Sequence, residues 1–154
     1  MDRTTSIDNT NKFSLDETDK KIVSLLQQNG RMSNVELAKQ VRLSPPPCLR
    51  RLKALERAKV IVGYKAQVDY RKLGYEIQAV IIVRLYSQDC DTVFHFSNTI
   101  VQLNDVIGVK ATIDYSCFII FIVSKNIEKY SSFLKTQIQN NKYVRSFETY
   151  MIDD

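Results

Sequence analysis

The segment SNVELAKQVRLSPPPCLRRLKALER, residues 33–57, decides the fold of the N-terminal half of the chain. Its first part predicts a short helix over about 34–41, because Ser33 and Glu36 have the spacing of a capping box. A tight connection follows, and then a second helix in which leucines recur every three residues along one edge. Two short helices joined in this way are typical of a helix-turn-helix.

Three consecutive prolines open the second of these helices. Proline is tolerated in a first helical turn, whose N–H groups have no partner within the helix. A residue that precedes proline is displaced from the α region, so we expect the helix to begin near Pro46 or Pro47. Ser44 is placed to cap it.

Further elements flank the segment. Asp16 predicts the start of a helix over about 16–28, which Asn29 and Gly30 end. Alternating apolar residues over 60–68 predict a β wing. We therefore expect a flexible arm over 1–13, a helix-turn-helix domain over 14–62 and a wing and linker over 63–74.

The charge is unevenly divided between the two halves. The chain has 22 Lys and Arg against 17 Asp and Glu, a net charge of +5. Residues 1–74 carry a net charge of +7 and residues 75–154 a net charge of −2. A basic module joined to a mildly acidic one indicates that the first meets a polyanion. The alternative is that the basic side chains are only the solvated face of an amphipathic helix.

The C-terminal half, residues 75–154, predicts six elements in the order β-α-β-β-α-β. They are strand 77–86, helix 91–103, strand 106–113, strand 117–124, helix 127–140 and strand 143–152. This order is that of the ferredoxin-like fold, in which two helices cover one face of an antiparallel sheet. The near-continuous apolar runs at 79–83 and 118–123 indicate a sheet buried on both faces. We therefore expect a homodimer, in which the partner covers the second face.

Several classes of protein are excluded by what the sequence lacks. The apolar runs are far shorter than the roughly 20 residues that span a bilayer, so we expect no membrane segment. The three cysteines form no CxxC pair, which argues against a zinc module or a disulfide framework and favours the cytoplasm. The sequence shows no Gly-rich phosphate loop, no paired carboxylates and no Ser-His-Asp set. We expect no enzyme, no metal and no cofactor.

The chain resembles the leucine-responsive regulator/AsnC family of transcription factors. The residues that carry the resemblance are LDxxDxxIxxL (15–25), GRMSNVELA (30–38), LSPPPCLRRLKALE (43–56) and VIVGY (60–64). It implies an α+β protein with an N-terminal winged helix-turn-helix and a C-terminal βαββαβ ferredoxin-like domain of the RAM type. It also implies a sequence-specific transcription regulator that binds double-stranded DNA, dimerises, assembles further into a tetramer or an octamer of dimers, and works in the cytoplasm at the nucleoid.

The resemblance also implies a set of DNA-binding residues. The start of the recognition helix is matched by Ser44, Pro46, Pro47 and Cys48, and its DNA-facing body by Arg50, Arg51 and Lys53. Ser33 and Asn34 begin the supporting helix, where free N–H groups suit a phosphate. We expect base or groove contacts from Arg50 and Lys53, and phosphate contacts from Arg31, Arg57 and Lys65.

An amino-acid effector is the remaining expectation, and here the chain departs from the family. The ungapped register places Asp114, Tyr115, Ser116 and Cys117 on the family's Gly-Asp-x-Asp turn, and a shifted register places Ala111 on its glycine. Both registers lose the glycine, which permits a positive φ or close approach of a ligand. The alternatives are therefore an amino acid, another small molecule, or an architectural or heterodimerising regulator that has lost effector sensing.

Overall fold

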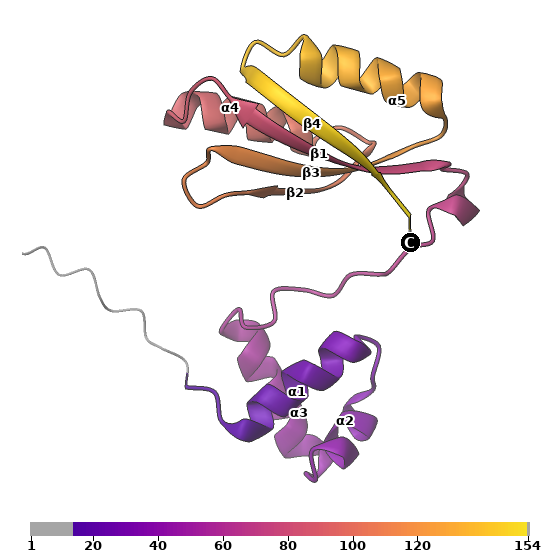
Figure 1. Cartoon of the computed structure of the whole chain (residues 1–154). Helices are drawn as coiled ribbons and strands as arrows, with labels where there is room; N and C mark the ends of the chain where they lie inside the picture. The colour runs from indigo at the N-terminus through magenta and orange to yellow at the C-terminus, as the bar shows by residue number, and fades with distance from the viewer. Residues whose placement is uncertain (1–13, 154) are drawn as a thin grey trace, which may run out of the picture. The chain divides into compact units, whose positions relative to one another are not determined.

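A computed structural model describes residues 14–153 of the chain (Figure 1). The arm expected over 1–13 lies outside the described residues. The chain forms two compact units, of which the first ends at Gln67 and the second begins at Val68. The division falls inside the segment 63–74 that the sequence indicated as wing and linker.

The first unit contains the three expected helices, α1 (Glu17–Gln28), α2 (Asn34–Gln40) and α3 (Pro45–Arg57). The predicted capping box of α2 is confirmed: the N–H of Glu36 donates to Ser33 Oγ (3.2 Å) and the N–H of Ser33 donates to Glu36 Oε2 (2.8 Å). Fully buried side chains from all three helices form the core of this unit, among them Ile22, Leu37, Cys48 and Leu55.

The start of α3 differs from the prediction in two ways. The helix begins at Pro45, because Ser44 alone takes the extended backbone that proline demands of its predecessor (φ −76°, ψ 155°). Ser44 occupies the N-cap position, but its side chain makes no capping hydrogen bond. A capping hydroxyl accepts from the second or third helical N–H, and both positions are proline. The first helical hydrogen bond is the one that the N–H of Cys48 donates to the Ser44 carbonyl (3.3 Å).

The predicted β wing over 60–68 is wrong for the isolated chain, since the structure places no strand in that segment. All four strands of the sheet belong to the second unit. Ile61 packs against the core of the first unit, whereas Val62 is 84% exposed. Alternating apolar residues form a strand only beside another strand, and this chain provides none there.

The second unit confirms the βαββαβ order. Its elements are β1 (Ile77–Leu85), α4 (Cys90–Val101), β2 (Val106–Ala111), β3 (Cys117–Ser124), α5 (Ile127–Phe133) and β4 (Val144–Ile152). The strands pair antiparallel in the order β2-β3-β1-β4. After α5 the chain continues in π-helical form over Leu134–Gln139, so the predicted helix 127–140 has nearly the right extent.

The two faces of the sheet are buried differently. Register pairs Ile81 with Ile120, and these side chains lie in the core beneath α4 and α5. The neighbouring pairs point to the opposite face, where Val80 meets Phe121 and Ile82 meets Ile119. These four side chains are only half-buried, and no described helix of this unit packs on them.

Candidate nucleic-acid interface

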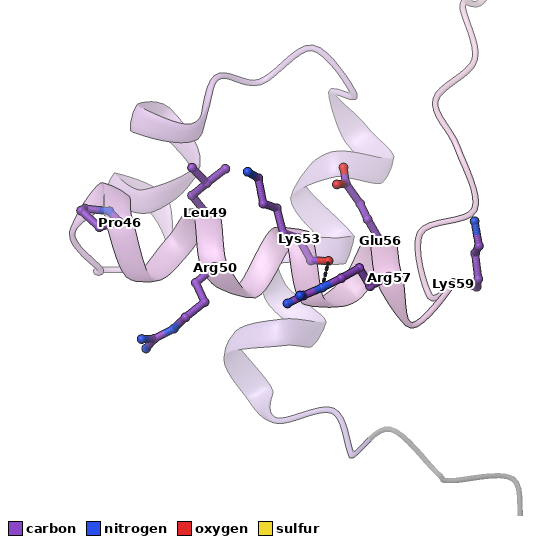
Figure 2. Close-up of a pocket in the computed structure, with 7 residues that line it drawn as sticks. All are labelled: Pro46, Leu49, Arg50, Lys53, Glu56, Arg57 and Lys59. Atoms are coloured by element: carbon purple, nitrogen blue, oxygen red, sulfur yellow. Dashed lines mark hydrogen bonds between the residues drawn. The ribbon is translucent and has the colours of Figure 1, made fainter.

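One face of α3 carries a broad groove of about 690 Å³ (Figure 2). The residues that line it recur at steps of three and four along the helix, which places them on one face. They are Pro46, Leu49, Arg50, Lys53, Glu56 and Arg57, with Lys59 just beyond the helix end. Four cations against a single carboxylate give this surface the sign that a polyphosphate backbone attracts.

Arg50 and Lys53 are the predicted groove contacts, and the structure leaves both available. Both side chains are exposed, and neither donates a hydrogen bond to any residue that the structure describes. Figure 2 shows Arg50 extending away from the helix. Arg57 also lines the groove, but its Nε donates to the Lys53 carbonyl (3.3 Å). This bond holds the Arg57 guanidinium near the end of α3.

Arg51 has a different place from the one expected. Its Nη1 donates to Asp16 Oδ2 (2.7 Å) and to Asp19 Oδ1 (2.9 Å), and the Asp19 side chain is buried. The hydrogen bonds to Asp19 and Asp16 raise the pKa of Arg51, and the N–H of Asp19 followed by Arg51 lowers the pKa of Asp16. The prediction that Arg51 belongs to the DNA-facing body is therefore corrected: its guanidinium joins α3 to α1.

Cys48 is also corrected. Its side chain is 0% exposed and lies in the core of the first unit, so it cannot touch DNA. Burial raises the pKa of its thiol. Among its neighbours, Pro46 lines the groove, Ser44 is exposed and Pro47 is half-buried.

The start of α2 uses its polar side chains to hold the turn between the helices. Ser33 Oγ is occupied in the capping box. Asn34 Nδ2 donates to the Pro45 carbonyl (2.9 Å), which connects the first residue of α2 to the first of α3. Asn34 Oδ1 is buried and has no hydrogen-bond partner within residues 14–153. Arg31 and Lys65 are exposed outside the helices. That these four residues contact DNA stays a prediction.

Sequence reasoning missed three residues of this surface, Leu49, Glu56 and Lys59. Glu56 follows Lys53 by three residues, and this spacing could have placed it on the same face. Lys59 lies beyond the helix in a left-handed conformation (φ 55°), where helical spacing no longer applies. Glu56 Oε1 accepts a hydrogen bond from the hydroxyl of Tyr64 (2.9 Å). The segment that follows α3 thus contacts a residue that lines the groove, through Tyr64.

The candidate effector turn, between β2 and β3, is held by hydrogen bonds among its own residues. Asp114 Oδ1 accepts hydrogen bonds from Thr112 Oγ1 (2.6 Å), from Ser116 Oγ (2.9 Å) and from the Ser116 N–H (3.1 Å). These bonds, that from Thr112 above all, lower the pKa of Asp114. The positive φ in this turn falls on Tyr115 (54°), and on neither of the residues that the two registers align with the family's glycine. Cys117 begins β3.

The C-terminal unit has a hollow of its own, at the opposite end of β2 from this turn. It measures about 360 Å³ and is lined by Leu103, Asn104, Asp105, Lys129, Ser132, Phe133, Thr136 and Gln137. Neither Asp105 nor Lys129 makes a side-chain hydrogen bond or ion pair with a residue that the structure describes. Thr136 and Gln137 belong to the π-helical segment, a form often found at functional sites.

Residues 14–153 lack two further features, a metal-binding cluster and a membrane-spanning helix. Within this range there is no group of three or more His, Cys, Asp or Glu side chains that could hold a metal ion. Over the same residues no helix has the length and apolar character needed to cross a membrane.

Comparison with known proteins assigns both units. Residues 15–62 match the winged helix-turn-helix DNA-binding domain, and residues 78–152 match the Lrp/AsnC ligand binding domain. The transcriptional regulator AzlB of Bacillus subtilis is 32% identical over 141 residues, which cover 90% of this chain and 88% of AzlB. The leucine-responsive regulatory protein of Rhizobium meliloti is 33% identical over 138 residues, with coverage of 90% and 88%.

Solved structures agree with these matches. A transcriptional regulator of Neisseria meningitidis, determined as an L-Met complex, superposes with a TM-score of 0.80 at 30% identity, covering 92% of this chain and 91% of that one. AsnC of Escherichia coli superposes with a TM-score of 0.73 at 27% identity, with coverage of 91% and 93%. AzlB and the Neisseria protein are both named as transcriptional regulators. The chain belongs to the Lrp/AsnC family of DNA-binding transcription regulators.

Proposed function

We propose that this regulator binds a palindromic DNA site as a homodimer, with one α3 helix in each of two successive major grooves. The observation that carries the proposal is the single cationic face of α3, on which Arg50 and Lys53 are exposed and without partners among the described residues. A two-fold dimer presents its recognition helices about 34 Å apart, so palindromic half-sites follow from its symmetry.

Roles within the interface follow from position. Arg50 and Lys53 contact base edges or the groove, while Arg31, Arg57 and Lys65 neutralise phosphates. The proposed interface also includes residues at the starts of α2 and α3, namely Ser33, Asn34, Ser44, Pro46 and Pro47. Binding that rests on Lys and Arg releases counterions and weakens steeply as salt rises.

The half-buried sheet face supports the dimer. Val80, Ile82, Ile119 and Phe121 form an apolar strip across β1 and β3. Beside it on β4 lies Glu148, which accepts hydrogen bonds from Arg84 (2.9 Å) and from the Tyr150 hydroxyl (2.9 Å). An apolar centre with a polar rim is the usual anatomy of a protein interface. Dimers of this kind would assemble further into a tetramer or an octamer of dimers.

Sedimentation analysis tests the dimer. Ile119→Lys places a charge in the apolar strip and should yield monomers, whereas Val101→Lys, a matched change on an exposed part of α4, should leave the wild-type mass unchanged. Monomeric wild-type protein, or an Ile119→Lys variant with unaltered mass, would contradict the interface.

DNA binding is tested with duplexes selected from a random pool and measured by fluorescence anisotropy. The double variant Arg50→Ala/Lys53→Ala should lose most of the affinity. Lys125→Ala/Lys135→Ala removes an equal charge from exposed positions of the second unit and should retain it. Equal losses in both variants would mean that net charge, rather than the face of α3, drives binding.

A regulator of this kind would work in the cytoplasm at the nucleoid.

For the second unit we propose an amino acid as effector. The proposal is supported by the match to the Lrp/AsnC ligand binding domain and by the relative determined with L-Met. Titration calorimetry across the amino acids tests it, with Asp114→Ala to probe the turn and Lys129→Gln to probe the 360 Å³ hollow. Loss of binding in one variant alone assigns the site.

A specific observation favours a second candidate, a DNA-binding regulator without effector sensing. The Asp114 carboxylate already receives three hydrogen bonds within its own turn, and a ligand would have to displace them. Under this alternative the protein acts as an architectural or heterodimerising regulator. No saturable heat with any amino acid, while salt-sensitive DNA binding is intact, would support it.

A further inference from the structure

The segment after α3 is fastened back onto the first unit at two points. Ile61 is the first point: its side chain packs against the core of this unit, and its N–H donates to the Leu55 carbonyl (3.2 Å). Tyr64 is the second point, and its hydroxyl donates to Glu56 Oε1 (2.9 Å). Between them, Val62 is largely exposed.

Tyr64 is held by its ring as well as by its hydroxyl. Its Cδ1 lies 3.6 Å from the position that a Cβ on Gly30 would occupy, so the ring covers the glycine that follows α1. The side chain is 50% exposed, which means that half of it is covered. Burial, and then the hydrogen bond and negative charge of Glu56, raise the pKa of Tyr64. An ordinary tyrosine phenol is already protonated at neutral pH, so the hydroxyl can donate to Glu56.

The second unit holds the other end of the linker. The Tyr70 carbonyl accepts hydrogen bonds from the N–H groups of Leu73 (3.1 Å) and Tyr75 (3.0 Å), and the rings of Tyr70 and Tyr75 meet edge to face at 6.1 Å. Arg71 forms an ion pair with Asp153, which follows β4. The chain that connects these two anchored ends runs from Tyr64 to Tyr70, and near its end Asp69 accepts a hydrogen bond from the Lys72 N–H (3.2 Å).

The length of this connecting chain limits how far the DNA-binding unit can reach. The six residue steps from Tyr64 to Tyr70 span at most about 20 Å, whereas the nine steps from Ile61 to Tyr70 span about 30 Å. The Tyr64 anchor thus shortens the reach by about 10 Å in each protomer. For two protomers the difference is about 20 Å, or about 6 base pairs at 3.4 Å per step.

We infer that Tyr64 is a positioning residue for DNA recognition: by tying the linker to Glu56 and Gly30, it limits the half-site spacings that one dimer can bind. This inference rests on the dimer proposed above. Glu56 stands on the same stretch of α3 as Lys53 and Arg57 (Figure 2), so the anchor attaches to the recognition helix itself. A shorter tether confines the second α3 to a smaller volume, which raises its effective concentration at correctly spaced half-sites.

The experiment measures affinity as a function of half-site spacing. A half-site is first selected from random duplexes, and pairs of it are then built with separations that change one base pair at a time across about two helical turns. Wild-type protein should show a narrow maximum. Tyr64→Ala should widen it by up to about 6 base pairs, and Tyr64→Phe, which keeps the ring, should widen it less. Tyr86→Ala, at an exposed tyrosine of the second unit, should change nothing.

A second variant keeps the test decisive if Tyr64→Ala unfolds in part. Inserting Gly-Ser-Gly after Ala66 lengthens the tether by three residues while Tyr64 stays intact, and it should reproduce the wider profile. A folded Tyr64→Ala protein with the wild-type profile, alongside a wider profile for the insertion, would overturn the inference. The inference would also be overturned if Tyr64→Ala weakened binding to a single half-site and to every paired site by the same factor. Wild-type protein with no spacing preference would instead overturn the dimer, and the inference with it.

Discussion

Replacing each of two adjacent arginines of α3 by alanine should affect different properties, DNA binding in one case and stability in the other. Arg50 is exposed and has no hydrogen-bond partner among the described residues, whereas Arg51 is paired with Asp16 and Asp19. Arg50→Ala should therefore change how DNA binding depends on salt. Arg51→Ala should leave that dependence unchanged and lower the melting temperature of the first unit, because it leaves the buried Asp19 without its cation.

The size of the first effect follows from counterion release. A guanidinium that enters the groove also displaces counterions from the duplex; if each Arg50 of a dimer accounts for one released counterion, the variant releases two fewer, and the slope of log K against log salt falls by about 1.8. Between about 50 and about 200 mM salt, wild-type affinity should then drop by about 12-fold more than that of the variant.

Fluorescence anisotropy with one selected duplex at four or more salt concentrations measures the slope, and a thermal melt measures stability. Equal slopes for wild type and Arg50→Ala would refute the assignment of Arg50 to the DNA surface. A slope that falls equally in Arg51→Ala would refute the separation of the two arginines. Lys135→Ala, at an exposed residue of the second unit, is the control for charge alone and should keep the wild-type slope.

Three further predictions concern stability. Leu55→Ala empties a site that is 0% exposed and should destabilise the first unit by about 2–5 kcal/mol, seen as faster hydrogen exchange in its helices and not in the sheet. Gly74→Ala places a side chain at φ 82°, and we expect urea unfolding to show a loss of about 1 kcal/mol. Hydrogen bonds from Ser87 and from the Thr92 N–H lower the pKa of Asp89 to about 2 from an ordinary 3.8. The ionised carboxylate therefore contributes its full stability above pH 3.8, and this contribution disappears as the pH falls towards 2. Asp89→Asn should flatten that part of the acid-unfolding curve.

Features set by local rules could be predicted from the sequence. The capping box of Ser33 and Glu36 involves residues three apart, and the near-continuous apolar run over 118–123 predicted the strand 117–124 that β3 occupies. Such signals need no knowledge of distant parts of the chain. The order of the six C-terminal elements followed in the same way.

Features that depend on distant residues could not be predicted from the sequence. Whether Arg50 or Arg51 faces outward depends on two aspartates more than 30 residues earlier, and a helical pattern alone leaves this open. The apolar alternation over 60–68 looked like a strand, but a strand also requires a neighbour to pair with. The 360 Å³ hollow brings residues 103–105 beside residues 129–137, a juxtaposition that no local spacing encodes.

The proline run at the start of α3 has a consequence for the thermodynamics of recognition. Ordering one residue of an ordinary chain costs about 1–2 kcal/mol of backbone entropy, and helix ends pay part of this each time they fray and re-form. In Pro45, Pro46 and Pro47 the ring already fixes φ, so little of that freedom exists to be lost. The end of the helix that we propose as part of the DNA interface is therefore preorganised by covalent structure, and complex formation would carry a smaller entropic penalty there.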